Sequence, residues 1–232
     1  MTRLFPRGVA DAPGLRAVVH DRHGTLTALD PRSGRVAWRA GHRLRPCALV
    51  GRTVVAVRIG APGEQDVPLV VVLLDARDGD ERWTSQPLPL PPWARPALDD
   101  TDEFTLAADD GDDHVVLHWT ARTSYRGGAA PGPGRLAAAR REASGAVRVD
   151  LAGRPAVTPL PEPPPRPAFA GFAQRTGATA RVGDLTVELA VRPGPASGTD
   201  IVLRGLDPHT EVPVWELVLD ETPPPRAPPL RP

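Results

Sequence analysis

His114 and His118 are the two side chains whose spacing could hold a metal ion. They are four residues apart in an alternating segment, so on a β-strand both would project from one face, with Val116 between them. If a carboxylate such as Asp112 converged on them, the three groups would form a ligand set typical of zinc or iron. The alternation has a simpler interpretation, in which the apolar neighbours pack and the histidine face is exposed and polar. A metal-dependent enzyme using His114 and His118 is therefore an alternative and not the main prediction.

Two further groups of reactive residues fall short of a catalytic or metal-binding pattern. The first does not follow the Asp-x-Asp-x-Asp-Gly spacing of calcium loops and is typical of a solvated hairpin tip: Asp109, Asp110, Asp112 and Asp113. The second lacks the Gly-x-Ser-x-Gly context of a hydrolase nucleophile: His20, Asp21, His23 and Ser33. The sequence therefore predicts a protein that is not an enzyme and that has no cofactor.

The composition argues against several classes of partner and site. Basic and acidic residues balance at 28 each, which does not favour nucleic acid or a membrane as the partner. Cys47 is the only cysteine, so no internal disulfide and no thiolate metal cluster can form. No apolar run is typical of a signal peptide or a membrane span, and we expect a cytoplasmic protein. Lys and Asn are absent while Ala, Gly, Pro and Arg are abundant, which is typical of a high-GC bacterial genome.

Three copies of a ten-residue pattern indicate what would position these residues. The copies read LDPRSGRVAW, LDARDGDERW and LDPHTEVPVW, at residues 29–38, 74–83 and 206–215. Each copy places an Asp eight residues before a Trp, with turn-forming residues between them. A repeat at this scale indicates an array of small β-units rather than one mixed α/β core.

Strand and turn signals place each copy at the end of a unit of about four antiparallel strands. Gly51 and Gly183, each in a short turn, both precede the Trp of their unit by 32 residues. The sequence thus predicts a single all-β domain over residues 1–232, with a Pro-rich tail at 220–232. The expected units cover about 1–40, 46–86, 103–150 and 168–219. The third unit lacks the pattern, and there we expect a hairpin turn at Ser144–Gly145.

The first copy resembles the repeat of the quinoprotein-type (pyrroloquinoline-quinone-like) β-propeller family, Ala-x-Asp-x-x-Thr/Ser-Gly-x-x-x-Trp. Its matching residues are Ala28, Asp30, Ser33, Gly34 and Trp38, and the other two copies match in part. The resemblance implies a propeller blade in which Trp38, Trp83 and Trp215 dock between neighbouring blades. The redox enzymes of that family use a vicinal disulfide and an Asn ligand to calcium. This chain has one Cys and no Asn, so the cofactor chemistry is not expected here.

Four blades are fewer than this family normally has, so the fold we predict is a truncated β-propeller of about four antiparallel blades. Such a propeller must close as a small ring, dimerise, or leave an open strand edge. An open edge could pair with an extended peptide. These alternatives stay open at the level of the sequence.

The long connections, rich in Pro and Gly, should all emerge on one face of the domain, where binding residues tend to lie. Trp93 lies in one of them and belongs to no repeat, while Arg122, Tyr125 and Arg126 lead into another. Aromatic and Arg side chains are frequent anchors of binding sites. We therefore predict a non-enzymatic binding protein with Trp93, Arg122, Tyr125 and Arg126 at its site.

The predicted partner is a peptide or a protein. One version of this prediction is an accessory protein that presents a peptide substrate to a modifying enzyme in a bacterial biosynthetic pathway. The alternative from another class is a homodimeric structural scaffold without a ligand.

Overall fold

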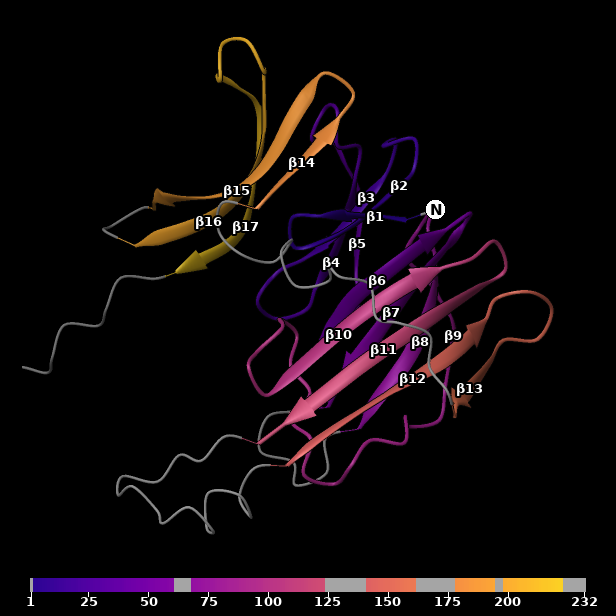
Figure 1. Cartoon of the computed structure of the whole chain (residues 1–232). Coiled ribbons are helices and arrows are strands. Elements are labelled where there is room, and N and C mark those ends of the chain that lie inside the picture. The colour runs from indigo at the N-terminus through magenta and orange to yellow at the C-terminus, as the bar shows by residue number, and fades with distance from the viewer. Residues whose placement is uncertain (1, 61–67, 124–140, 162–177, 195–197, 223–232) are drawn as a thin grey trace, which may run out of the picture.

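The computed structural model describes residues 2–60, 68–123, 141–161, 178–194 and 198–222, and these residues form seventeen antiparallel strands and no helix. The strands make four separate sheets. Each sheet is formed by one continuous stretch of the chain, so its strands have neighbouring colours in Figure 1. The predicted all-β class with about four antiparallel blades is confirmed. The described residues contain no helix that could cross a membrane.

Each sheet is built from strands that are consecutive in the chain and are hydrogen-bonded in chain order. The first sheet contains β1 (Thr2–Phe5), β2 (Gly8–Asp11), β3 (Ala17–His20), β4 (Leu26–Leu29) and β5 (Val36–Ala40). The second contains β6 (Leu44–Val50), β7 (Thr53–Ile59), β8 (Leu69–Asp75) and β9 (Glu81–Thr84). The third contains β10 (Phe104–Asp110), β11 (His114–Arg122), β12 (Glu142–Asp150) and β13 (Ala156–Leu160). The fourth contains β14 (Thr179–Val182), β15 (Leu185–Pro193), β16 (Thr199–Leu206) and β17 (Pro213–Thr222).

Three apolar clusters hold neighbouring sheets together. One joins the fourth sheet to the first, one joins the first to the second, and one joins the second to the third. The sheets therefore stand in the spatial order fourth, first, second, third, although the fourth is last in the chain. In the second sheet, β7 and β8 are almost wholly apolar because a neighbouring sheet covers each of their two faces.

The repeat Trp and the repeat Gly form the contact between sheets. The ring of Trp38 lies on Gly79 of the second sheet, where a Cβ atom would come within 2.7 Å of the indole, and its N–H donates to Ala76 O at 3.0 Å. Trp215 lies in the same way on Gly34 of the first sheet. Both glycines also have positive φ, +69° at Gly34 and +80° at Gly79, which favours glycine at these turns.

The third sheet differs from the sequence-based expectation at Ser144–Gly145. No turn occurs there, because β12 runs straight through both residues and pairs them with Thr120 and Trp119 of β11. A Cβ atom at Gly145 would lie 2.7 Å from the Trp119 indole. A glycine is therefore needed here because a large ring packs closely against the strand. A sequence pattern does not distinguish such a glycine from one in a turn.

The first sheet has a fifth strand, β1, which lies at one edge of the sheet and contacts the other sheets. The Thr2 hydroxyl donates to Leu49 O and accepts from Leu49 N, both on β6, and Thr2 N donates to Asp110 of β10. Phe5 is buried in the cluster shared with the fourth sheet. Through these contacts β1 links the first sheet to the other three sheets.

Candidate functional site

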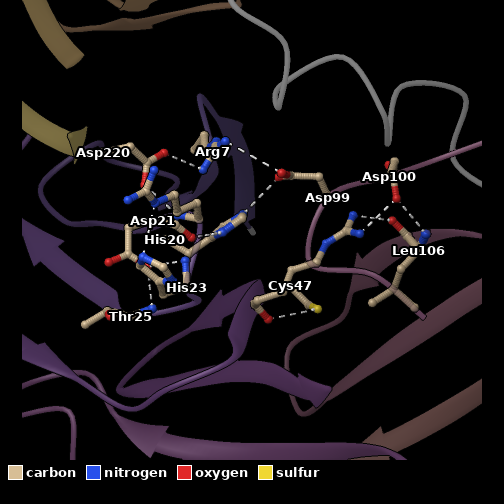
Figure 2. Close-up of polar contacts among 12 residues, drawn as sticks. Arg7, His20, Asp21, His23, Thr25, Cys47, Asp99, Asp100, Leu106 and Asp220 are labelled. Carbon is tan, nitrogen blue, oxygen red and sulfur yellow. Dashed lines mark hydrogen bonds and ion pairs between the residues drawn. The ribbon is translucent and has the colours of Figure 1, made fainter. Parts of the chain in front are cut away.

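The connection between β9 and β10, residues 85–103, carries Trp93 and follows the outside of the second sheet before it turns inward. Its start is hydrogen-bonded to β8, because Ser85 N donates to Val71 O at 2.9 Å and Leu88 N to Leu69 O at 2.8 Å. Two acidic residues, Asp99 and Asp100, hold its end (Figure 2). We call this segment the β9–β10 connection.

Asp100 fixes the connection to the second sheet through a buried ion pair. Arg45 of β6 donates from Nη1 to Asp100 Oδ1 at 2.9 Å and from Nη2 to Leu106 O at 2.9 Å. Asp100 Oδ1 also accepts from Leu106 N of β10. The Arg45 side chain is almost fully buried, so its charge needs this partner to remain in the interior.

Asp99 faces a second buried arginine, Arg7, in the turn between β1 and β2. Arg7 Nη1 donates to Asp220 of β17 at 3.1 Å, and its Nη2 lies 3.6 Å from Asp99 Oδ2. Asp220 also accepts from Arg22 N at 2.7 Å. Figure 2 shows Arg7 between the two carboxylates. Arg7 therefore links the first sheet, the fourth sheet and the end of the β9–β10 connection.

The last member of this group is His20, which lies on β3 and is only 1% exposed. Its Nδ1 lies 3.0 Å from the carbonyl oxygen of Asp21. Because a carbonyl can only accept, Nδ1 carries the hydrogen and Nε2 of the neutral ring is an acceptor. Nε2 lies 3.7 Å from Asp99 Oδ1. Burial lowers the pKa of His20 to about 4, although the negative charge of Asp99 opposes this effect.

Two close ion pairs, Arg45–Asp100 and Arg7–Asp220, form this group, while His20 Nε2 and Asp99 Oδ1 have no hydrogen-bond partner among the described residues. Burial raises the pKa of the nearby Cys47 thiol to about 11, which keeps it protonated at neutral pH. Within the described ranges, no three His, Cys, Asp or Glu side chains converge as a metal site would require. We refer to Arg7, His20, Arg45, Asp99, Asp100 and Asp220 as the axial cluster.

Trp93 lies at a turn in the middle of the β9–β10 connection. Ala94 N donates to Pro91 O at 2.9 Å, which places Pro92 and Trp93 at the two central positions of the turn. The Trp93 ring packs against the apolar cluster between the second and third sheets and is half-buried. Arg95 Nη1 donates back to Pro92 O and Ala94 O. The connection thus presents part of an aromatic ring and an arginine in an ordered turn.

Arg122 lies at the end of β11 and is exposed, with two hydrogen bonds to Glu142 Oε1 at 2.9 and 3.0 Å. Its backbone N donates to Glu103 O, so it emerges at the end of the third sheet where the β9–β10 connection arrives. Tyr125 and Arg126 lie outside the described residues. The structure therefore brings Arg122 and the end of this connection to one side of the third sheet.

His114 and His118 share a face of β11, as alternation predicts, but the face is not uniformly exposed. His114 is half-buried and its Nδ1 lies 2.8 Å from Asp113 Oδ1, whereas His118 is buried. The expectation of an exposed pair is thus wrong for His118. Sequence reasoning also missed the axial cluster, although the pair Asp99–Asp100 at the end of a Pro-rich connection was a signal that could have pointed to it.

No protein-family model and no curated protein matches the chain. Among solved structures, it is similar to BamB from Moraxella catarrhalis, with 16% identity and a TM-score of 0.35 over 90% of this chain. It is also similar to the Cps50 (Swd1) β-propeller domain of Myceliophteria thermophila, with 14% identity and a TM-score of 0.34 over 95% of this chain. The chain spans 62% and 55% of the lengths of those two chains.

Proposed function

We propose that this protein is a non-enzymatic binding module that engages a peptide or protein partner through the β9–β10 connection. The observation that carries the proposal is the anchoring of this connection by Asp99 and Asp100, while Trp93 at its centre stays partly exposed. A segment that is already ordered loses little conformational freedom when it binds. Trp and Arg side chains in such a setting are frequent anchors of protein interfaces.

The chemistry of the axial cluster supports a binding role over catalysis. Arg45 pairs with Asp100 and Arg7 lies 3.6 Å from Asp99, both carboxylates of the β9–β10 connection, so these charges help to hold the connection in place. His20 is buried and its lowered pKa keeps it neutral at physiological pH. Its Nδ1 donates to a backbone carbonyl, and its Nε2, the ring's acceptor, has no hydroxyl or thiol hydrogen-bonded to it among the described residues.

The finer version of the proposal concerns the partner. An accessory protein that presents a peptide substrate to a separate modifying enzyme needs an ordered surface and no reactive groups of its own. We propose this role, in the cytoplasm of a bacterium, for the chain. The candidate ligand is then a precursor peptide encoded beside the gene for this protein.

Calorimetric titration of the full chain with that peptide tests the proposal. Trp93→Ala and Arg122→Ala should each weaken binding by about 1–2 kcal/mol, which is about five- to thirtyfold in Kd. Arg39→Ala, which removes an exposed arginine on the outer strand of the first sheet, is the matched control and should bind as the unmodified chain does. Equal affinity in all three variants would show that the β9–β10 connection is not the binding site.

A further inference from the structure

The outermost strand of the fourth sheet, β17, is unlike the outer strands of the other sheets. It is ten residues long, whereas β5 and β13 have five residues and β9 has four. It is paired only with β16 among the described strands, so one row of its backbone groups has no strand beside it (Figure 1). Proteins usually protect such an edge by making it short or by placing basic residues or proline along it. Here the single proline is at the first position.

Two valines beside Trp215 depart from the repeat. Val212 and Val214 are 59% and 58% exposed, and they lie three residues and one residue before the Trp. The first repeat has Arg35 and Ala37 at these places, and the second has Asp80 and Arg82. The contact between sheets requires the Trp and the Gly of the repeat but not an apolar residue at these two positions. The fold therefore gives no reason for exposed valines here.

A third exposed valine lies near the glycine of the same contact, on the neighbouring sheet. Val36 of β5 is also exposed, and it lies two residues after Gly34, on which the Trp215 ring rests. The three valines thus lie within three residues of Trp215 or Gly34, which form the contact between the fourth and first sheets. We call Val36, Val212 and Val214 the rim valines.

The charge along β17 is of one sign. Residues 210–222 contain no basic residue and four acidic ones: Glu211, Glu216, Asp220 and Glu221. Glu216 pairs with Arg192 and Asp220 pairs with Arg7, while Glu211 and Glu221 are exposed. Two copies of β17 paired antiparallel would bring acidic residues of one copy beside those of the other, which is unfavourable. A second copy of this chain is therefore a poor occupant of the edge.

We propose that the β17 edge receives an extended segment of a protein partner, in which apolar and basic residues alternate. The backbone of that segment would continue the ladder of the fourth sheet, and its apolar side chains would cover the rim valines. Its basic side chains would lie near Glu211 and Glu221. The inference rests on the proposed function only in that the chain binds a protein partner. It uses β17 of the fourth sheet, whose end is linked through Arg7 to the end of the β9–β10 connection, but it does not use Trp93.

The probe is a synthetic nine-residue peptide of alternating Arg and Val, blocked at both ends and labelled for fluorescence anisotropy. Binding to the full chain should be lost when alternate backbone amides of the peptide are N-methylated, because these cannot join a ladder. Replacement of its Arg residues by Glu should also abolish binding. If the N-methylated peptide binds as well as the parent peptide, charge attraction alone is responsible and the inference is wrong.

The variant that tests the edge is Val214→Lys, which adds a basic residue at an exposed position of β17. It should weaken binding of the alternating peptide about tenfold or more. Val191→Lys is the matched control, since Val191 of β15 is 51% exposed in the same sheet but does not belong to β17, and it should leave binding unchanged. Equal weakening by the two variants would overturn the inference. So would a dimer in sedimentation analysis that Val214→Lys dissociates.

Trp93→Ala separates this inference from the proposed function. It should leave binding of the alternating peptide unchanged. If Trp93→Ala weakens binding of the precursor peptide while no variant alters binding of the alternating peptide, the proposed function stands and the edge inference fails. If the reverse is found, the edge is a binding site and the β9–β10 connection is not.

Discussion

The indole ring of Trp38 lies on the backbone of Gly79 in the neighbouring sheet and donates its N–H to Ala76 O at 3.0 Å. The same contact occurs between Trp215 and Gly34, except that the N–H of Trp215 has no acceptor among the described residues and lies over Gly205 of its own sheet. A Trp–Gly contact thus joins the first sheet to the second and the fourth sheet to the first. The stability of the whole array should depend on it.

Truncation of Trp38 should be among the most damaging single changes in the first two sheets. Trp38→Ala removes a buried ring and leaves a cavity between sheets, with an expected loss of about 3–5 kcal/mol in the free energy of unfolding. Urea denaturation measures this loss. Trp83→Ala should have an effect of the same kind, because Trp83 packs against the cluster between the second and third sheets. A loss below about 1 kcal/mol for Trp38→Ala would contradict its role.

The glycine side of the same contact gives a matched pair of variants. Gly34→Ala and Gly51→Ala both place alanine at positive φ, +69° and +57°, which costs about 1–2 kcal/mol in each. At Gly51 a Cβ atom meets nothing within 4 Å, whereas at Gly34 it would lie 2.6 Å from the Trp215 indole. Gly34→Ala should therefore be destabilising by about 1–3 kcal/mol more than Gly51→Ala. Equal unfolding midpoints for the two variants would argue against the contact.

His20 should make stability depend on pH in a window set by its lowered pKa. The unfolded chain binds a proton at His20 near pH 6.5, but the folded protein does so only at about pH 4. Between these values the unfolded state binds more protons, so stability is complete above pH 6.5 and falls as the pH decreases toward 4. The shift corresponds to about 3 kcal/mol. Urea titrations at several pH values should show this slope, and His20→Leu should reduce it.

The two adjacent anchors of the β9–β10 connection should differ in their contribution to stability. Asp100→Ala leaves the buried Arg45 without its carboxylate, and we expect a loss of about 3–5 kcal/mol in the free energy of unfolding. Asp99→Ala should cost much less, because the Asp99 side chain is 43% exposed and its contacts to Arg7 and His20 are longer than hydrogen bonds. Thermal denaturation of the two variants compares them directly. The opposite ranking would show that Asp99 is the main anchor.

The repeat could be found in the sequence because it joins residues close together in the chain. An Asp eight residues before a Trp is a local pattern in all three copies, and Trp38 and Trp215 make the same contact with a glycine of the neighbouring sheet. The order of the sheets could not be derived in this way. The fourth sheet lies beside the first because Arg7 pairs with Asp220, 213 residues later, and the cluster around Phe5 draws on both ends of the chain.

The errors at single residues have local physical causes. Gly145 is compatible with either a turn or a close approach, and only the position of the Trp119 ring decides between them. His118 follows the polar face of β11 by alternation, but its burial depends on groups from elsewhere in the chain. The axial cluster combines residues from β3, β6, β17, the turn before β2 and the β9–β10 connection. No spacing in the sequence relates these residues to one another.

The last prediction concerns which residues contact the partner: Trp93 in the β9–β10 connection, or the arginines at and after the end of β11. Arg122 is exposed and its ion pair with Glu142 is also exposed, so Arg122→Ala should leave the melting temperature nearly unchanged. Trp93 packs against the core, so Trp93→Ala should lower the melting temperature as well as weaken binding. Calorimetry with the precursor peptide, carried out well below both melting temperatures, separates the two effects. If Arg122→Ala and Arg126→Ala bind normally while Trp93→Ala does not, the partner contacts the β9–β10 connection alone. If only the two arginine variants are weakened, the contact lies at the end of β11, and Trp93 serves the fold.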